Sequence, residues 1–355
     1  MKNLMFVVKK ALKGTGWVYF LSFVALFFMT LATVFTSFLS KVLVDAFKNE
    51  LYKAENIEKL VINIISLGKG EQFIYDNMYV LPVAIIISSL ILAGITILRG
   101  YLRFRSSASI NKTMQYSLFC HLQNQPYEYF QRAKSGDLIQ TCTRDVDVLR
   151  KFLIMETSQA FYTLFIFILC SSILFEISVK LTLVCLSLLP IMFIYSFFII
   201  KEVRKRYRAT DDSEADMVDD ISEVLNSIRV IKAYNSETYE INKFEGKLKD
   251  YEGKFKRWKM VSSFFFSSSD IFIFSSSALA LIYSLYLVYI GEITSGTLVI
   301  SYSFINMMVW PLRNTATSLS NLGQVQASAD RIKTLLDEKE EDIVSGDTLQ
   351  INGDI

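Results

Sequence analysis

The sequence predicts an all-α membrane protein with six long transmembrane helices that extend into the cytoplasm. Of its 355 residues 52% are hydrophobic, and the mean hydropathy is +0.34, higher than is usual for a soluble domain. The apolar residues are gathered into long runs, the first of which covers about residues 17–44. A run of that length is long enough to cross a bilayer as a tilted helix.

Residues 1–14 are predicted to form a separate interfacial segment before the first span. This segment contains four lysines among apolar residues, a pattern that predicts a short amphipathic helix over residues 3–12. Such a helix lies on the membrane surface with its lysines on lipid phosphates. The apolar run that follows is too long for the h-region of a signal peptide.

The remaining spans follow from the lengths of the apolar runs. The second span begins near Tyr79 and leaves the apolar region at Arg99. Residues 152–200 would extend over about 70 Å as one helix, more than twice the hydrocarbon thickness, so this run must fold back. Its only charged break is 176–180, which separates spans three and four. By the same argument the glycine-flanked segment 291–296 separates spans five and six.

The distribution of Lys and Arg orients these spans. Residues 99–151 contain nine basic residues and residues 201–259 contain fourteen, whereas the hairpins at 176–180 and 291–296 contain one and none. Basic residues near span ends mark the cytoplasmic side. The sequence therefore predicts a multi-pass protein of the plasma (inner) membrane with both termini in the cytoplasm. The 45–78 loop lies outside, and its role is open.

The cytoplasmic loops are predicted to be rigid helical hairpins. No Gly or Pro occurs between Tyr101 and Gln125, so the second span continues as one helix to Pro126, with about 40 Å beyond the membrane. Spans four and five repeat this arrangement and turn at about residues 233–239. Long hairpins of this kind suit the relay of motion, although an ordinary solvated helical hairpin gives the same pattern.

Several classes of function are excluded by composition and motifs. The net charge of +2 is too small to indicate nucleic acid as a partner. The four cysteines have neither metal nor disulfide spacing, and the single His121 excludes a multi-histidine metal site. No G-x-x-x-x-G-K-[ST] motif is present. We therefore predict no catalytic residue, no metal ligand and no cofactor site in this chain.

Four motifs in the predicted loops and in the sixth span can be compared with a known family. The first loop has aromatic residues at Tyr127, Tyr129 and Phe130, then Gly136 and Asp137, then Arg144 and Asp145. The second loop carries the run 222–237, the sixth span carries 291–299 and 310–312, and the exit helix carries 327–337. In this order the motifs resemble the transmembrane domain of ATP-binding cassette (ABC) exporters of the type-1 fold. The closing residues 351–355 resemble the start of the family's nucleotide-binding domain.

Two details of the first loop rest on physical arguments. Gly136 permits a turn, and Asp137 can cap the helix that returns to the membrane, with or without a role in coupling. Asp147 lies close to Asp145, so either carboxylate can be the counterpart of the family's aspartate. The second loop is the sharper match: Tyr234 and Glu237 are expected to face a groove on the nucleotide-binding domain.

The resemblance implies an interfacial elbow helix at 1–14, a six-span domain at 15–330, and a linker with the first strand of a nucleotide-binding domain at 331–355. It implies two coupling helices that contact nucleotide-binding domains. The expected contact residues are Tyr127, Tyr129, Phe130, Ala233, Tyr234, Asn235 and Glu237, and the residues expected to turn or brace the hairpins are Gly136, Asp137, Arg144, Asp145, Glu223 and Arg229.

The resemblance also implies an ATP-driven pump that works by alternating access as a domain-swapped dimer, with itself or with a related subunit. ATP and Mg²⁺ are expected in the nucleotide-binding domains, so the complete transporter would be an ATP-hydrolysing translocase. The substrate class stays open between amphipathic molecules, lipids and peptides.

Polar residues within the spans are candidates for the substrate pathway, or else for packing at an interface. They are Asp270, Asn306 and Gln159. Two other functions remain open: a non-pumping regulatory membrane module of the same architecture, and an ion-coupled transporter that uses Asp270. The second alternative favours inverted repeats or spans broken by Gly and Pro, neither of which the sequence shows.

Overall fold

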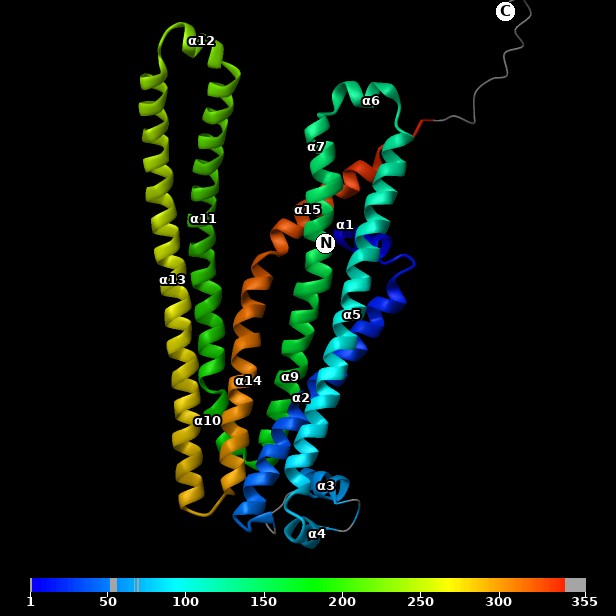
Figure 1. Ribbon diagram of the computed structural model, residues 1–355, viewed down its shortest axis with the longest axis vertical. Helices are drawn as coiled ribbons and strands as arrows, with labels where there is room; N and C mark the ends of the chain where they lie inside the picture. Colours follow the sequence, from blue (N-terminus) through cyan, green and yellow to red (C-terminus); the bar gives the residue numbers. More distant parts are fainter. Residues whose placement is uncertain (1, 52–55, 67, 69, 342–355) are drawn as a thin grey trace, which may run out of the picture. The chain divides into compact units, whose positions relative to one another are not determined.

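The computed structural model describes residues 2–51, 56–66, 68 and 70–341. Within these ranges every regular element is a helix (Figure 1), so the predicted all-α class is confirmed. The expected strand at 351–355 lies outside the described residues. In chain order the helices are α1 (Lys2–Ala11), α2 (Gly16–Phe47), α3 (Asn56–Ile65), α4 (Glu71–Asp76), α5 (Val80–Gln123), α6 (Tyr127–Arg132), α7 (Ser135–Gln140), α8 (Val146–Lys151), α9 (Thr157–Ile177), α10 (Val179–Leu186), α11 (Leu188–Asn226), α12 (Ile228–Ala233), α13 (Glu237–Tyr289), α14 (Ser295–Ser320) and α15 (Leu322–Asp337).

The lengths and hydropathy of the helices fit a membrane protein. Among the described residues, five helical stretches are long and apolar enough to cross a bilayer, namely Gly16–Phe47, Val80–Gln123, Ser135–Ile177, Val179–Asn226 and Glu237–Tyr289. The sixth predicted span lies in α14, where Ser301, Ser303 and Asn306 interrupt the apolar residues and lower the hydropathy. The membrane class is thus confirmed, and the sixth span stays a prediction.

Both predicted outer hairpins occur where the sequence placed them. The helix α9 ends at Ile177, and the extended Ser178 begins α10 by accepting a hydrogen bond from the Leu181 amide at 3.4 Å. The second break follows α13, where Gly291 has φ 78°. That left-handed backbone favours glycine because a Cβ would be crowded there. A charged or glycine-containing break was therefore sufficient to locate both turns.

By its internal contacts the chain divides into two compact units. The first unit contains Met1–Leu39, Val61–Leu169 and Ser318–Ile355, and the second contains Ser40–Leu60 and Cys170–Thr317. In the first unit, the π-helical segments Thr141–Asp145 and Phe152–Glu156 join α7, α8 and α9 into one helical stretch.

The core of the first unit forms where α1 packs against α5 and α15. Val7 and Ala11, one helical turn apart on α1, are fully buried with Met114 of α5 and Ile332 of α15. The opposite face of α1 is exposed and carries Lys9. The predicted amphipathic helix therefore exists, and its buried apolar residues contact the protein itself, whereas Met5 and Phe6 are exposed.

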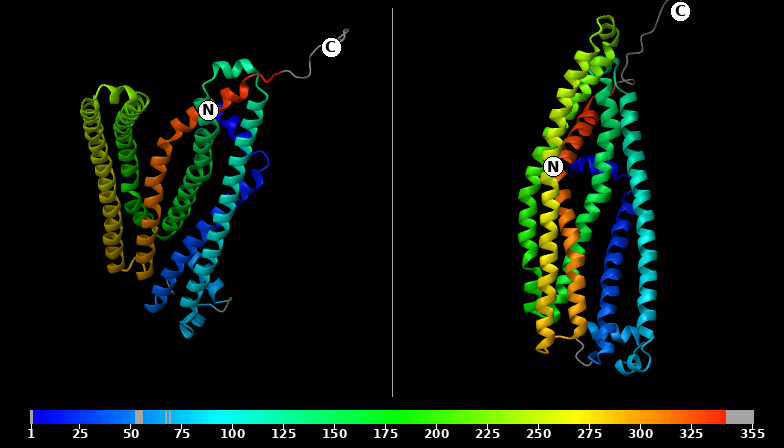
Figure 2. Two further views of the ribbon diagram at one scale, coloured as in Figure 1. Left: turned by 45° about the horizontal axis from the view of Figure 1, so that its top comes forward. Right: turned by 60° about the vertical axis from the view of Figure 1, so that its left-hand side comes forward.

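The second unit is organised around the antiparallel pair α11 and α13. The two helices have 39 and 53 residues, and the views of Figure 2 show them running side by side. Ser213 Oγ donates to Asp250 Oδ2 at 2.8 Å, and Lys247 Nζ donates to Asp220 Oδ1 at 2.6 Å. The short α12 closes this hairpin (Figure 1). The predicted long helical hairpin is therefore confirmed.

The turn between α6 and α7, predicted to be cytoplasmic, differs from the prediction in which residues reverse the chain. Gly136 lies inside α7, and Asp137 is the third residue of that helix and makes no capping hydrogen bond. Ala133 and Lys134 reverse the chain instead, because both adopt extended backbone angles between α6 and α7. Such angles need no glycine, which is why Gly136 was the wrong residue for the turn.

Candidate functional site

The helix α6 closes the tip formed by α5 and α7 in the first unit. Pro126 precedes α6 with extended angles, which end the long α5 and redirect the chain. Tyr127 and Phe130 are exposed, at 75% and 45% of their surface, whereas Tyr129 packs against the core of the unit. The rings of Tyr129 and Phe130 meet edge to face at 5.6 Å. Of the three predicted contact residues, Tyr127 and Phe130 are thus free to bind a partner, and Tyr129 positions Phe130.

The helix α12 closes the corresponding tip of the second unit. Its inner side is anchored by Ile231, which is buried, and Ala233 is its last residue. Tyr234 follows directly with 78% of its surface exposed. A large exposed aromatic side chain beside a short rigid helix is the kind of anchor that protein interfaces use.

The backbone after Tyr234 explains how that side chain is held. Asn235 adopts the left-handed conformation with φ 49°, which asparagine tolerates better than most residues. The next amide, Ser236 N–H, donates to the Ile231 carbonyl at 3.0 Å and closes α12. Lys232 Nζ donates to Glu237 Oε1 at 2.7 Å, which ties α12 to the first residue of α13. Glu237, which the sequence predicted to face a nucleotide-binding domain, is therefore also ion-paired with Lys232 within the tip.

The predicted bracing residues of this hairpin have unequal roles. Glu223 lies 3.7 Å from Lys243 Nζ across the hairpin, as expected for a weak brace. The stronger brace is Asp220, which is buried and pairs with both Lys243 and Lys247. Arg229 is exposed on α12 and makes no ion pair among the described residues. Nothing in the sequence distinguishes Asp220 from the other acidic residues of the run in which it lies.

In the first unit, Asp145 is the carboxylate that connects distant elements. Arg331 of α15 donates to Asp145 through Nε at 2.7 Å and through Nη2 at 2.6 Å, and the Ser328 hydroxyl donates at 2.8 Å. This hydrogen bonding raises the pKa of the Arg331 guanidinium. Asp147 pairs only within its own turn, with Arg150 and Lys151. The neighbouring Arg144 is exposed.

Asp145 therefore pairs with a distant helix, whereas the pairs of Asp147 are local, and which of the two is the family's counterpart stays open. The helix α15 (Leu322–Asp337) runs without a break across residues 330 and 331, where the sequence placed the end of the membrane domain. Arg331 therefore packs with the first unit, although the sequence assigned it to the linker.

The candidate pathway residues lie in two different units. In the second unit Asp270 of α13 pairs with Arg313 of α14 at 2.6 Å, a partner that the sequence analysis did not identify. Asn306 of α14 accepts a hydrogen bond from the Ser277 hydroxyl of α13 at 3.3 Å. Gln159 is half-buried on α9 in the first unit. The structure thus places Asp270 and Asn306 on the same pair of helices in the second unit, and Gln159 belongs to the first unit.

A buried ionic cluster joins α2, α3 and α14 within the second unit, and the sequence analysis did not find it. Lys41 donates to Glu58 and lies 3.7 Å from Asp45, and all three side chains are almost completely buried. Asp45 accepts hydrogen bonds from the Gly296 amide at 2.7 Å and from the Thr294 hydroxyl at 2.9 Å. In the described part of the chain, no group of three or more His, Cys, Asp or Glu side chains could hold a metal ion.

Comparison with known proteins agrees with this arrangement. The sequence model of the family "ABC transporter transmembrane region" matches residues 19–312. The "Uncharacterized ABC transporter ATP-binding protein YknU" of Bacillus subtilis (strain 168) is 30% identical over 227 residues, which are 64% of this chain and 38% of that protein.

A second relative is the "Multidrug resistance ABC transporter ATP-binding and permease protein" of Lactococcus lactis subsp. lactis (strain IL1403). It is 25% identical over 250 residues, which are 69% of this chain and 42% of that protein. The chain therefore spans less than half of the length of these two relatives. The family match covers most of the helices described above, including both tips. This chain belongs to the family of ABC transporter transmembrane regions.

Proposed function

We propose that this chain is the membrane-spanning half of an ATP-driven exporter and forms the translocation pathway by alternating access. The proposal rests on the two exposed hairpin tips of this chain, together with its membership of the family of ABC transporter transmembrane regions. Tyr127 on α6 and Tyr234 after α12 are each about three quarters exposed at the end of a long helical hairpin. We infer that both tips bind nucleotide-binding domains.

The second hairpin has the properties of a lever. Its two helices are joined by ion pairs such as Asp220 with Lys247, and its tip is closed by the Lys232–Glu237 pair. A displacement of α12 would therefore move α11 and α13 together. Reversing a conformational equilibrium from 1:99 to 99:1 takes about 5.5 kcal/mol, which ATP binding to the partner domains would supply.

The proposed complete transporter contains two such membrane domains with six spans each, arranged as a domain-swapped homodimer or heterodimer. The nucleotide-binding domains hold ATP and Mg²⁺, on the same polypeptide or on a separate one. Both termini and both tips face the cytoplasm of a cell whose plasma membrane holds the protein. The substrate we propose is amphipathic, which the aromatic content of the spans favours.

The ion pair of Asp270 favours this proposal over an ion-coupled transporter. A carboxylate that carries a proton or sodium ion must exchange it with water during each cycle. Asp270 is instead paired with Arg313 at 2.6 Å, and the Arg313 side chain is only 7% exposed. A permanent counter-charge opposes cation binding at Asp270 because the attraction for the cation is largely cancelled.

The test is Tyr234→Ala in the complete transporter reconstituted in proteoliposomes. We expect transport to fall and substrate-stimulated ATP hydrolysis to be lost, while the protein stays folded. The matched control is Tyr289→Ala, which removes an even more exposed tyrosine from the other end of α13. Unchanged transport and stimulation in Tyr234→Ala would contradict the proposal. Absence of any ATP hydrolysis or transport in the wild-type complex would favour the regulatory module.

A further inference from the structure

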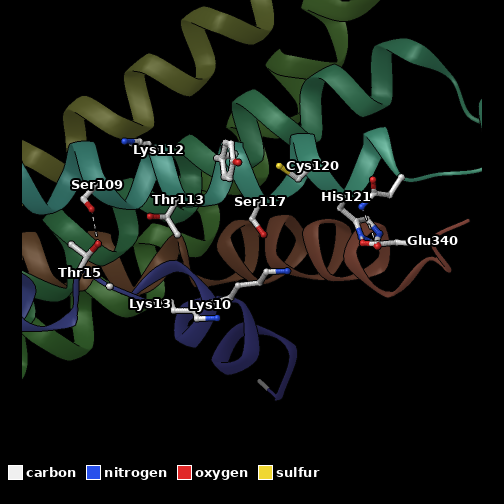
Figure 3. Close-up of a pocket in the computed structure, with 13 residues that line it drawn as sticks. Lys10, Lys13, Thr15, Ser109, Lys112, Thr113, Ser117, Cys120, His121 and Glu340 are labelled. Carbon is white, nitrogen blue, oxygen red and sulfur yellow. Dashed lines mark hydrogen bonds and ion pairs between the residues drawn. The ribbon is translucent and has the colours of Figure 1, made fainter. Parts of the chain in front are cut away.

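A cavity of about 560 Å³ lies in the first unit between the N-terminal segment and α5, and the transport proposal does not use it. Lys10 and Lys13 approach it from the N-terminal segment (Figure 3). Lys112, Thr113 and Ser117 line it from α5. The lining is therefore rich in cationic and hydroxyl groups, and it belongs to elements that already pack together through α1.

The cavity has an excess of positive charge. Among the described residues, none of the three lysines makes a salt bridge. The acidic residue in the lining, Glu340, is already engaged: its Oε1 lies 2.7 Å from His121 Nδ1, and its Oε2 accepts from Asn124 at 3.2 Å. Hydrogen bonding to His121 lowers the pKa of the Glu340 carboxyl. The lining thus holds three lysine charges and one carboxylate charge, that of Glu340. Because at least two positive charges stay uncompensated, the cavity favours an anionic ligand.

The hydroxyl groups fit a ligand with several acceptor oxygens. Thr113 and Ser117 are one helical turn apart on α5 and therefore share a face. In Figure 3 the Ser117 side chain points from α5 toward the side from which Lys10 approaches. At the other end of the cavity the hydroxyls of Thr15 and Ser109 are hydrogen-bonded to each other at 2.6 Å. Ammonium and hydroxyl donors around one space are the groups that bind phosphate oxygens.

The position of the cavity indicates where a phosphate would come from. Thr15 directly precedes the apolar helix α2, and Trp17 near its start is 75% exposed. Exposed tryptophan at the end of an apolar helix marks the membrane interface. The Thr15–Ser109 contact places the cavity beside this end of α2, at the level of lipid headgroups. Lipid phosphates and phosphates dissolved in the cytoplasm can both reach it.

We propose that this cavity is a binding site for an anionic phosphate group, held by Lys10 and Lys13 with the hydroxyls of Thr113 and Ser117. The ligand is a phosphate monoester or inorganic phosphate. Its source is either an anionic lipid headgroup or the aqueous phase. Glu340, at the end of the cavity beyond α15, sets the boundary of the site, because an anion cannot lie against its carboxylate.

Cys120 provides a reporter for occupancy, since it lines the cavity and is half-buried. Cys170 and Cys185 are buried, so Cys142→Ser leaves Cys120 as the accessible thiol among the four cysteines. The experiment measures the rate of maleimide labelling of Cys120 in the full transporter in phosphatidylcholine vesicles. Inorganic phosphate is titrated in one arm, and phosphatidic acid is added to the vesicles in the other.

We expect labelling to slow in at least one arm, and the arm that responds identifies the source. Lys10→Gln should weaken the apparent affinity by about fivefold, since one lysine near a membrane surface contributes on the order of 1 kcal/mol to binding an anion. Ser117→Ala should weaken it without any change of charge. The matched control is Lys9→Gln, which removes the same charge from the exposed face of α1 outside the cavity.

Two results would contradict the proposal that this cavity binds a phosphate group. The first is an unchanged labelling rate in both arms. The second is equal loss of protection in Lys9→Gln and Lys10→Gln, which would mean that general surface charge attracts the anion. The transport activity of the Lys10→Gln and Lys9→Gln variants is not needed for either conclusion, so failure of this inference and failure of the exporter proposal are distinguishable.

Discussion

The guanidinium of Arg313 on α14 donates a hydrogen bond to the Asp270 carboxylate on α13 at 2.6 Å. The guanidinium also lies over the Trp310 ring, with its central carbon 4.1 Å from the ring centroid. Arg313 is nearly buried, whereas 43% of the Asp270 side chain is exposed. The pair therefore keeps the buried cation compensated and leaves one side of the carboxylate accessible.

Asp270→Asn is predicted to destabilise the protein more than Arg313→Met. The first change leaves a buried guanidinium without its counter-charge, while the second leaves a carboxylate that can still reach solvent. We expect a difference of about 1–3 kcal/mol, below the roughly 3–5 kcal/mol that breaking a fully buried pair costs, because Asp270 is partly exposed. Thermal unfolding of the two variants in the same detergent measures this difference. Equal unfolding temperatures of the two variants would contradict the predicted asymmetry between the buried guanidinium and the partly exposed carboxylate.

Gly296→Ala is predicted to be strongly destabilising. A Cβ at this position would lie 2.4 Å from the Lys41 carbonyl oxygen and 2.5 Å from Asp45 Oδ2, both of which are fixed by the buried cluster. Overpacking of this kind costs about 1–3 kcal/mol or more.

The matched control for that substitution is Gly94→Ala in α5, where no atom lies within 4 Å of the added Cβ. It should be neutral or slightly stabilising, because alanine has the higher helix propensity. Chemical denaturation or thermal melting compares the two variants. Similar stabilities would mean that α14 does not approach α2 as closely as described.

Asp145→Asn is predicted to loosen α15 from the first unit. The substitution removes the charge that accepts two hydrogen bonds from Arg331, and charge-assisted bonds contribute about 1.5–3 kcal/mol each when buried. Because Arg331 is half exposed, we expect a total loss of about 2 kcal/mol. Hydrogen exchange of the α15 amides should become faster. Asp147→Asn, which removes only a local pair, is the control and should leave α15 unchanged.

The sequence predicted the long helices well, because their signals are local. Apolar runs, the absence of Gly and Pro, and the charged break before Ser178 determine where helices continue and end. The structure agrees with these predictions in α5, α11 and α13. The reversal at Ala133 and Lys134 was missed because extended angles carry no sequence signature comparable to that of glycine.

The ion pairs between distant helices could not be predicted from the sequence. Asp145 and Arg331 are 186 positions apart, and both are surrounded by other charged residues. The periodicity of a sequence predicts which face of a helix a residue occupies. It does not predict which other helix packs against that face, because this depends on the tertiary structure. The same holds for Asp270, whose partner Arg313 lies on the next helix. The turns at α6 and α12 and the exposed Tyr234 were within reach of the sequence, whereas the buried Asp220 brace behind α12 was not.

The proposed exporter function requires that the tip at Tyr234 contacts a nucleotide-binding domain. The most direct test replaces Tyr234 with a photo-crosslinking phenylalanine analogue in the complete transporter within its membrane. We expect a crosslink to the nucleotide-binding domain from position 234 and none from the control position Tyr289. Absence of a crosslink from 234, or an equal yield from 289, would contradict it.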